Sequence, residues 1–171
     1  MDTLLPKSSD IRTLPLRAIV AYAYRTARRI LVRSDLQHME AIHHQLACLE
    51  EFVCSPTIPE DIAARVAKAT AELIGSVGLR PETADLVLSF ARAADCCIAA
   101  AMALSGDHTE APQRLADAAR KATEAAKSLS GADAGRSFSD YEVLLRLFGQ
   151  EESGVLGSAF DPSESGPLGP L

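Results

Sequence analysis

The stretch EAIHHQLAC, residues 40–48, holds the densest group of side chains that could do chemistry. Glu40 and His43 are three residues apart, and His44 and Cys48 are four apart, so on a helix each pair shares one face. Carboxylate, imidazole and thiolate groups are common ligands of zinc in proteins. Glu40, His43, His44 and Cys48 are therefore a candidate metal site, which could belong to a sensor or to a metal-dependent enzyme.

The surrounding pattern favours a plainer interpretation of these residues. A di-iron bundle needs a second Glu-x-x-His pair, but the histidine beyond this helix, His108, has Ser105 in the glutamate position. No Cys-x-x-Cys or His-Glu-x-x-His spacing supports zinc. Apolar residues recur through the segment every three or four positions, which predicts an inward stripe with the histidines at its edge or opposite it. We therefore expect boundary and surface histidines, and no cofactor.

The remaining reactive groups do not form a catalytic pattern. Cys96 and Cys97 lie within an alanine-rich apolar stretch, where a thiol packs like a small hydrophobic side chain, and Asp95 beside them disfavours a thiolate. The sequence has no nucleophile elbow, no phosphate-binding glycine loop and no dinucleotide fingerprint. We expect no catalytic residues and predict that the chain is not an enzyme.

Four arginines form the strongest local charge feature. Arg25, Arg28, Arg29 and Arg33 fall in the last two turns of the first expected helix. Cations near a helix C-terminus interact favourably with the helix dipole, which explains the cluster without a function. The alternative is a positive patch that binds a phosphate, a nucleic acid or an acidic partner. These four residues are our candidate partner-binding site.

Composition and charge limit the class of protein. Alanine is the most frequent residue, aromatic residues make up 5% and there is no Trp, which favours an all-α fold. The formal net charge of −6 makes a general nucleic-acid binder unlikely on electrostatic grounds. We see no signal peptide, and the longest uninterrupted apolar run, CCIAAAMAL, is too short to span a bilayer. We expect a cytoplasmic protein without a membrane segment.

Apolar periodicity and turn residues divide the chain into six expected helices. They cover about residues 15–33, 34–53, 57–74, 81–105, 109–130 and 139–148. Ser34 is an expected cap of the second helix, and SDYE, residues 139–142, is an expected capping box for the last. We predict one all-α bundle of five to six helices over residues 13–149, with an irregular arm over 1–12. A loosely ordered Gly/Ser/Pro-rich tail follows over 150–171, which Leu156, Phe160 and Leu168 could anchor.

Both ends of the chain carry motif-like stretches, LPLRAIVAYAYRTARRI at residues 14–30 and FDPSESGPLGPL at residues 160–171. With these stretches the chain resembles a group of uncharacterised alanine-rich helical proteins of bacteria. That resemblance implies an all-helical fold and assigns no activity. A more distant similarity, in composition, is to immunity proteins, which are helical bundles that neutralise a cognate toxin.

These observations lead to one expected function and two alternatives. We expect a non-enzymatic interaction protein, either an immunity-like protein or an accessory binding protein. Its expected partner is another protein, and the sequence also allows a homo-oligomer. The first alternative is a metal-binding sensor or enzyme that uses Glu40, His43, His44 and Cys48. The second is an anion or nucleic-acid binder that uses the arginine cluster.

Overall fold

A computed structural model describes residues 5–77, 80–106 and 108–171. These residues form seven helices and no strand, so the predicted all-α bundle is confirmed. The helices are α1 (Ser8–Ile11), α2 (Leu16–Val32), α3 (Glu40–Cys54), α4 (Ile62–Val77), α5 (Pro81–Ser105), α6 (Ala111–Ala126) and α7 (Gly131–Phe148). The helix beyond the predicted five to six is α1, a single turn within the expected irregular arm.

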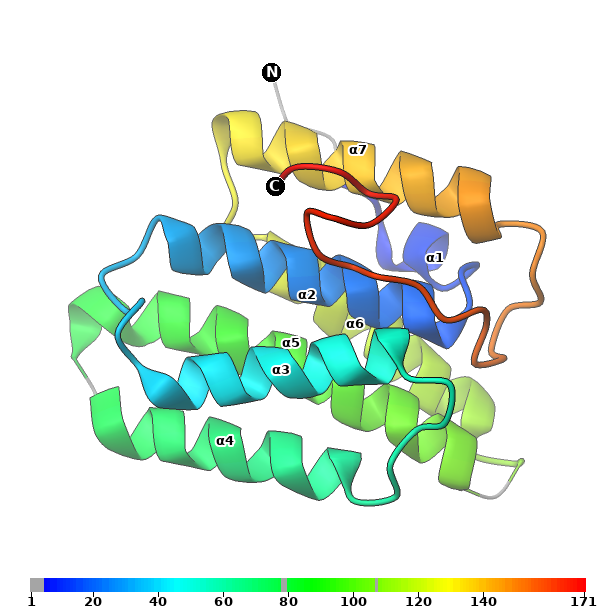
Figure 1. The fold of residues 1–171 in the computed structure, drawn as a ribbon, viewed down its shortest axis with the longest axis horizontal. Coiled ribbons are helices and arrows are strands. Elements are labelled where there is room, and N and C mark those ends of the chain that lie inside the picture. The colour runs from blue at the N-terminus through cyan, green and yellow to red at the C-terminus, as the bar shows by residue number, and fades with distance from the viewer. Residues whose placement is uncertain (1–4, 78–79, 107) are drawn as a thin grey trace.

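Helix α2 lies at the centre of the bundle, in contact with α3, α5, α6 and α7 (Figure 1). Every residue from Leu16 to Ala27 is buried, although two of them are arginines. An amphipathic helix normally leaves its charged side in water. Here both faces of α2 are covered, because the C-terminal tail crosses the side that carries the arginines (Figure 1).

Alanine is frequent where neighbouring helices pack. Helices α5 and α6 form the most extensive helix pair in the bundle. Both helices carry small side chains with no exposed surface: Ala93, Ala94, Cys96, Cys97 and Ala100 on α5, and Ala118, Ala119 and Ala122 on α6. Such side chains let two backbones approach and still exclude water.

Three helix starts differ from the predictions. Helix α4 begins at Ile62 instead of residue 57, because residues 55–61 form turns and bends. Helix α3 begins at Glu40 instead of Ser34, because the Ser34 hydroxyl donates to the Leu31 carbonyl and accepts from the Leu36 amide in a turn. Helix α7 begins at Gly131, so the expected cap at Ser139 is an interior helical residue. The serine and acid of a cap motif are local signals, and tertiary contacts of α7 with α2 extend the helix past them.

Among the described residues, α5 is the one helix that is long and apolar enough to cross a membrane. The apolar character of α5 extends beyond the nine-residue run CCIAAAMAL, because the polar residues elsewhere in the helix are few. In the most apolar part of α5, 44% of the residues are buried inside the bundle. Core helices of soluble proteins meet the same criteria, so this is weak support for a membrane segment.

The tail, residues 149–171, contains no helix or strand and runs back across the bundle between α3 and α7 (Figure 1). The amides of Leu16 and Arg17 donate to the carbonyls of Val155 and Leu156 at 2.9 and 3.0 Å. The Phe160 ring stacks on Phe148 with 4.6 Å between ring centroids. Glycine and proline exclude regular structure here, yet these contacts give the tail a defined path.

Candidate functional site

Two adjoining hollows lie between α3 and α4, where the sequence placed its candidate metal site. The first has a volume of about 340 Å³ and includes His44 and Cys48 of α3 and Lys68 and Glu72 of α4 in its lining. The second, of about 410 Å³, shares His44 and Glu72 and adds Glu40. Three of the four predicted ligands, Glu40, His44 and Cys48, therefore line one continuous groove.

These ligands do not converge on one point. Nε2 of His44 lies 3.7 Å from a Glu40 carboxylate oxygen, and both side chains are exposed. His43 is outside the groove lining, and its Nε2 is 2.7 Å from the Gln37 carbonyl oxygen. Burial raises the pKa of the Cys48 thiol, which disfavours the thiolate that binds metals. Within residues 5–77, 80–106 and 108–171, no three His, Cys, Asp or Glu side chains converge on a metal position.

Arg25 lies in the interior of the protein, with no exposed surface. Its Nε is 3.0 Å from Oδ2 of Asp140 on α7. Its two Nη groups donate to tail carbonyls, at 2.9 Å to Gly169 and 2.7 Å to Pro170, with longer contacts to those of Pro162 and Leu168. The guanidinium thus joins three parts of the chain: α2, α7 and the tail.

Arg29 shares the same carboxylate. Its Nη1 is 2.6 Å from the Asp140 Oδ2 atom that Arg25 also contacts, and its side chain is 3% exposed. Its Nε is buried without a hydrogen-bond partner in the described part of the chain. A buried ion pair is stable only when its charges are matched and hydrogen-bonded. Asp140 is therefore the acid that pairs with both Arg25 and Arg29 in the described part of the chain.

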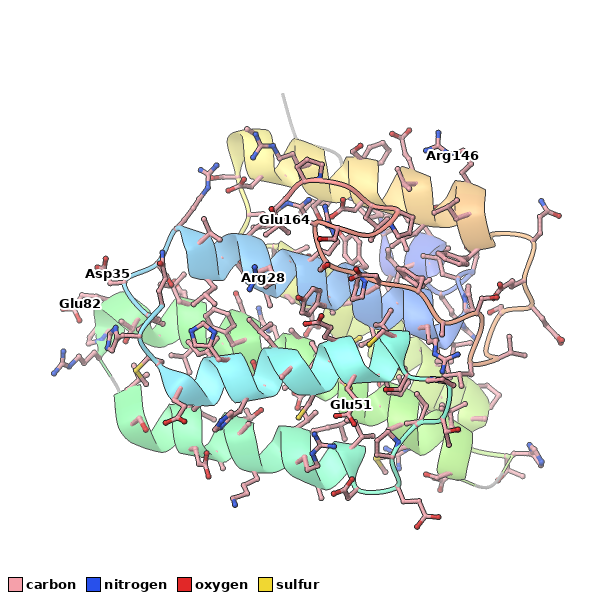
Figure 2. The ribbon with its side chains drawn as sticks, in the orientation of Figure 1. Arg28, Asp35, Glu51, Glu82, Arg146 and Glu164 are labelled. Carbon is pink, nitrogen blue, oxygen red and sulfur yellow. The ribbon has the colours of Figure 1, made fainter. Side chains whose placement is uncertain are left out.

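The other two arginines of the cluster point elsewhere. Arg33 extends from the end of α2, 61% exposed, with its Nε 2.6 Å from a carboxylate oxygen of Asp133. Arg28 is half-buried, and Figure 2 shows it on α2 beside the tail that carries Glu164. The four side chains do not form one surface patch, because burial removes Arg25 and Arg29 from the surface. Arg28 and Arg33 remain candidates for partner binding.

Arg17 is a structural residue that the sequence reasoning missed. Its guanidinium donates to the carbonyls of Phe52 and Ser55 at the end of α3, and at 2.8 Å to that of Gly157 in the tail. The last carbonyls of a helix have no partner within the helix, and a cation satisfies them well. Arg17 therefore fastens α3 and the tail to α2.

Asp140 belongs to the SDYE motif, which matches a helix cap by sequence but lies inside α7. A signal for its burial was present in the sequence. Asp133, Ser137, Asp140 and Leu144 follow one another at spacings of four, three and four, and all four are buried against the bundle. The Ser137 hydroxyl donates to the Tyr22 hydroxyl at 2.9 Å on the same face. Acidic and hydroxyl side chains at helical spacing on α7, combined with the arginines of α2, predict an ion pair inside the protein.

The adjacent cysteines on α5 are packed in the core. Neither Cys96 nor Cys97 has exposed surface. Burial raises the pKa of both thiols well above the ordinary value, and the neighbouring Asp95 acts in the same direction on Cys96. All four cysteines are free. The neutral thiols fill space between helices, as predicted for small hydrophobic side chains.

No protein-family model, curated protein or solved structure shows significant similarity to the chain.

Proposed function

We propose that this chain is a non-enzymatic, cytoplasmic interaction protein whose acidic exterior binds a basic protein partner. The observation that carries the proposal is where the positive charge lies. Arg17, Arg25 and Arg29, which are three of the seven basic residues in the first 33, are inside the bundle. The net charge of the chain is −6, and burial of these three arginines leaves the exterior more acidic than the sequence alone suggests.

Complementary charge steers two proteins together and suppresses wrong partners. Helices α4 and α5, which pack on each other, also expose large apolar side chains: Ile74 is 49% and Leu88 45% exposed. Exposed acids accompany them on the same two helices, namely Glu72, Glu82 and Asp85. Exposed apolar side chains together with charged ones are found in many transient interfaces. The distant resemblance to immunity proteins fits a binder of this type.

Crosslinking in the native cell, followed by binding measurements on the purified pair, tests this proposal. We expect a basic partner whose association rate falls about tenfold or more as salt rises from low to high concentration. Reversing Glu72, Glu82 and Asp85 to lysine should abolish the steering. A matched reversal of three exposed acids elsewhere, Glu142, Glu152 and Glu164, should leave the complex stable. A salt-independent complex, or a partner without basic character, would refute the proposal.

An anion-binding function is a second candidate, supported by the Nε of Arg29, which has no hydrogen-bond partner among the described residues. Arg29, Arg33 and Arg136 line a hollow of about 290 Å³ together with Asp133 and Glu164. The two acids offset the arginines, so the hollow is only weakly favourable for an anion. Titration with inorganic phosphate tests this candidate, and binding should disappear in Arg33→Glu.

A metal-binding function rests on Glu40, His44 and Cys48 lining the same groove. Metal analysis of the purified chain tests it. A stoichiometric metal that is lost in His44→Ala would favour a sensor or enzyme over the interaction protein. His43→Ala is the matched control, since His43 lies outside the groove lining.

A further inference from the structure

The contact between the tail and the bundle has the character of a protein–peptide interface. Arg25 recognises the tail through the carbonyl oxygens of residues 162 and 168–170, and Arg17 through that of Gly157. Phe160 also donates its amide to the Val53 carbonyl at 3.3 Å. These bonds engage the peptide backbone, which is how extended peptides are commonly held in grooves.

Only a few tail side chains add apolar anchoring. Pro162 and Leu168 are the two buried residues of the segment 150–171, and Phe160 stacks on Phe148. The rest of the segment is exposed or half-buried. A small number of anchors within a polar contact is typical of a binding interface.

The surface beneath the tail is partly charged, although Leu156, Phe160 and Leu168 of the tail pack with the hydrophobic core. Below the tail, between α2, α3 and α7, lie charged side chains from two helices, namely Arg25 and Arg29 of α2 and Asp140 of α7. Charged groups regain hydration when a cover is removed, whereas an apolar core does not. The tail has no internal helix or strand, so its departure breaks no regular element. Such a segment belongs to the part of a protein that opens locally before the rest unfolds.

We propose that residues 155–171 are an exchangeable peptide, and that the groove between α2, α3 and α7 also binds this segment from a second copy of the chain. The argument for this occupant is chemical identity. The tail is the segment whose fit to the groove the structure demonstrates, and every further copy carries the same carbonyls and anchors. Residues 149–154, the first part of the tail, connect the exchangeable peptide to α7 and include Gly149 and Gly154, which allow the path to change.

Competition between the attached tail and a second tail sets the concentration at which exchange occurs. A segment on a short flexible connection has an effective concentration of about 1 mM at its own groove. Binding of a tail from a second copy therefore becomes as frequent as binding of the attached tail when the chain concentration is near that value. A substitution that weakens binding of the attached tail lowers the chain concentration needed for exchange, because the groove is then open for a larger fraction of time.

A synthetic peptide of residues 158–171, carrying a fluorophore, tests the groove on the full-length protein. We expect the Leu168→Asp chain to bind this peptide about tenfold or more tightly than the unsubstituted chain, because its own tail competes less. Leu147→Asp is the matched control, since Leu147 is an exposed leucine on α7, and should behave as the unsubstituted chain does. A peptide with Asp in place of Leu168 should bind neither protein. Equal peptide affinity of the folded Leu168→Asp and unsubstituted chains would overturn the proposal.

A second measurement uses the unsubstituted chain alone. The protein is unfolded in denaturant and refolded at about 1 mM or at about 1 µM, and the oligomeric state is measured by light scattering after dilution. Dimers that form only on concentrated refolding, and that excess peptide prevents, support exchange. Monomers alone after concentrated refolding would overturn the second copy as occupant, even if the peptide binds.

Discussion

Removing the Asp140 carboxylate tests whether the interior charge cluster stabilises the fold. Asp140→Ala leaves the guanidiniums of Arg25 and Arg29, 0% and 3% exposed, without their shared counter-charge. Deleting one partner of a buried ion pair typically destabilises a protein by about 3–5 kcal/mol. Release of the tail would let water reach Arg25, so the expected loss is toward the lower end, about 3 kcal/mol. Asp140→Asn keeps one acceptor oxygen but no charge, and should cost about 2 kcal/mol.

Urea unfolding followed by far-ultraviolet circular dichroism measures this loss, because the chain has no Trp to report by fluorescence. Asp95→Ala is the matched control. Asp95 is 48% exposed and 3.3 Å from the Lys121 ammonium, so its removal should cost about 0.2–1 kcal/mol. Limited proteolysis should cut the tail of the Asp140→Ala chain faster than that of the unsubstituted chain. An Asp140→Ala protein within about 1 kcal/mol of the unsubstituted one would refute the reasoning.

Three further predictions concern thiols, a tyrosine and a glycine. Cys54 is the exposed thiol among the four, so a thiol reagent should modify one group rapidly in the native chain, and Cys54→Ser should remove that phase. Burial raises the pKa of Tyr22 from 10.0 to about 12, so its contribution to stability is present below pH 10 and is lost as pH rises to about 12. Tyr22→Phe should flatten that alkaline decline in urea unfolding. Gly157 has φ +83°, and a Cβ would lie 2.6 Å from Pro15 Cβ, so Gly157→Ala should destabilise by about 1–3 kcal/mol.

Each of these predictions has an outcome that contradicts it. Rapid modification of more than one thiol would show that the core cysteines are accessible. A Tyr22→Phe chain with an unchanged alkaline decline would mean that another group titrates. Gly154→Ala is the control for Gly157→Ala, because Gly154 has nearly the same φ of +84° but its Cβ would make an ordinary 3.5 Å contact. Equal losses in the two variants would assign the effect to backbone strain and not to the clash with Pro15.

Helix positions could be predicted where the signal is local. Proline opens α5 and an apolar stripe runs to Ser105, and the structure has the same bounds. The predicted helix starts were wrong where a serine could either cap a helix or make another contact. Ser34 and Ser139 both match cap motifs, but Ser34 bonds within a turn and Ser139 lies inside α7. A motif of four residues cannot report whether a neighbouring helix will cover it.

The candidate sites illustrate the same difference. The spacing of Glu40, His44 and Cys48 predicted a shared helix face, and the structure places these residues along one groove. The spacing of Arg25 and Arg29 likewise predicted a shared face, which they have. It could not reveal that Asp140, 115 positions from Arg25, would lie against that face.

The sequence by itself determined the helical class, most of the helix positions and the irregular tail, because propensity, apolar spacing and glycine and proline content act over short stretches of chain. The tertiary structure decided which charges face water. Helix α2 has the amphipathic pattern of a surface helix, but the tail and α7 supply carbonyls and a carboxylate that satisfy its arginines inside the protein. Whether a charge is buried depends on partners distant in the chain, so local patterns alone do not decide it.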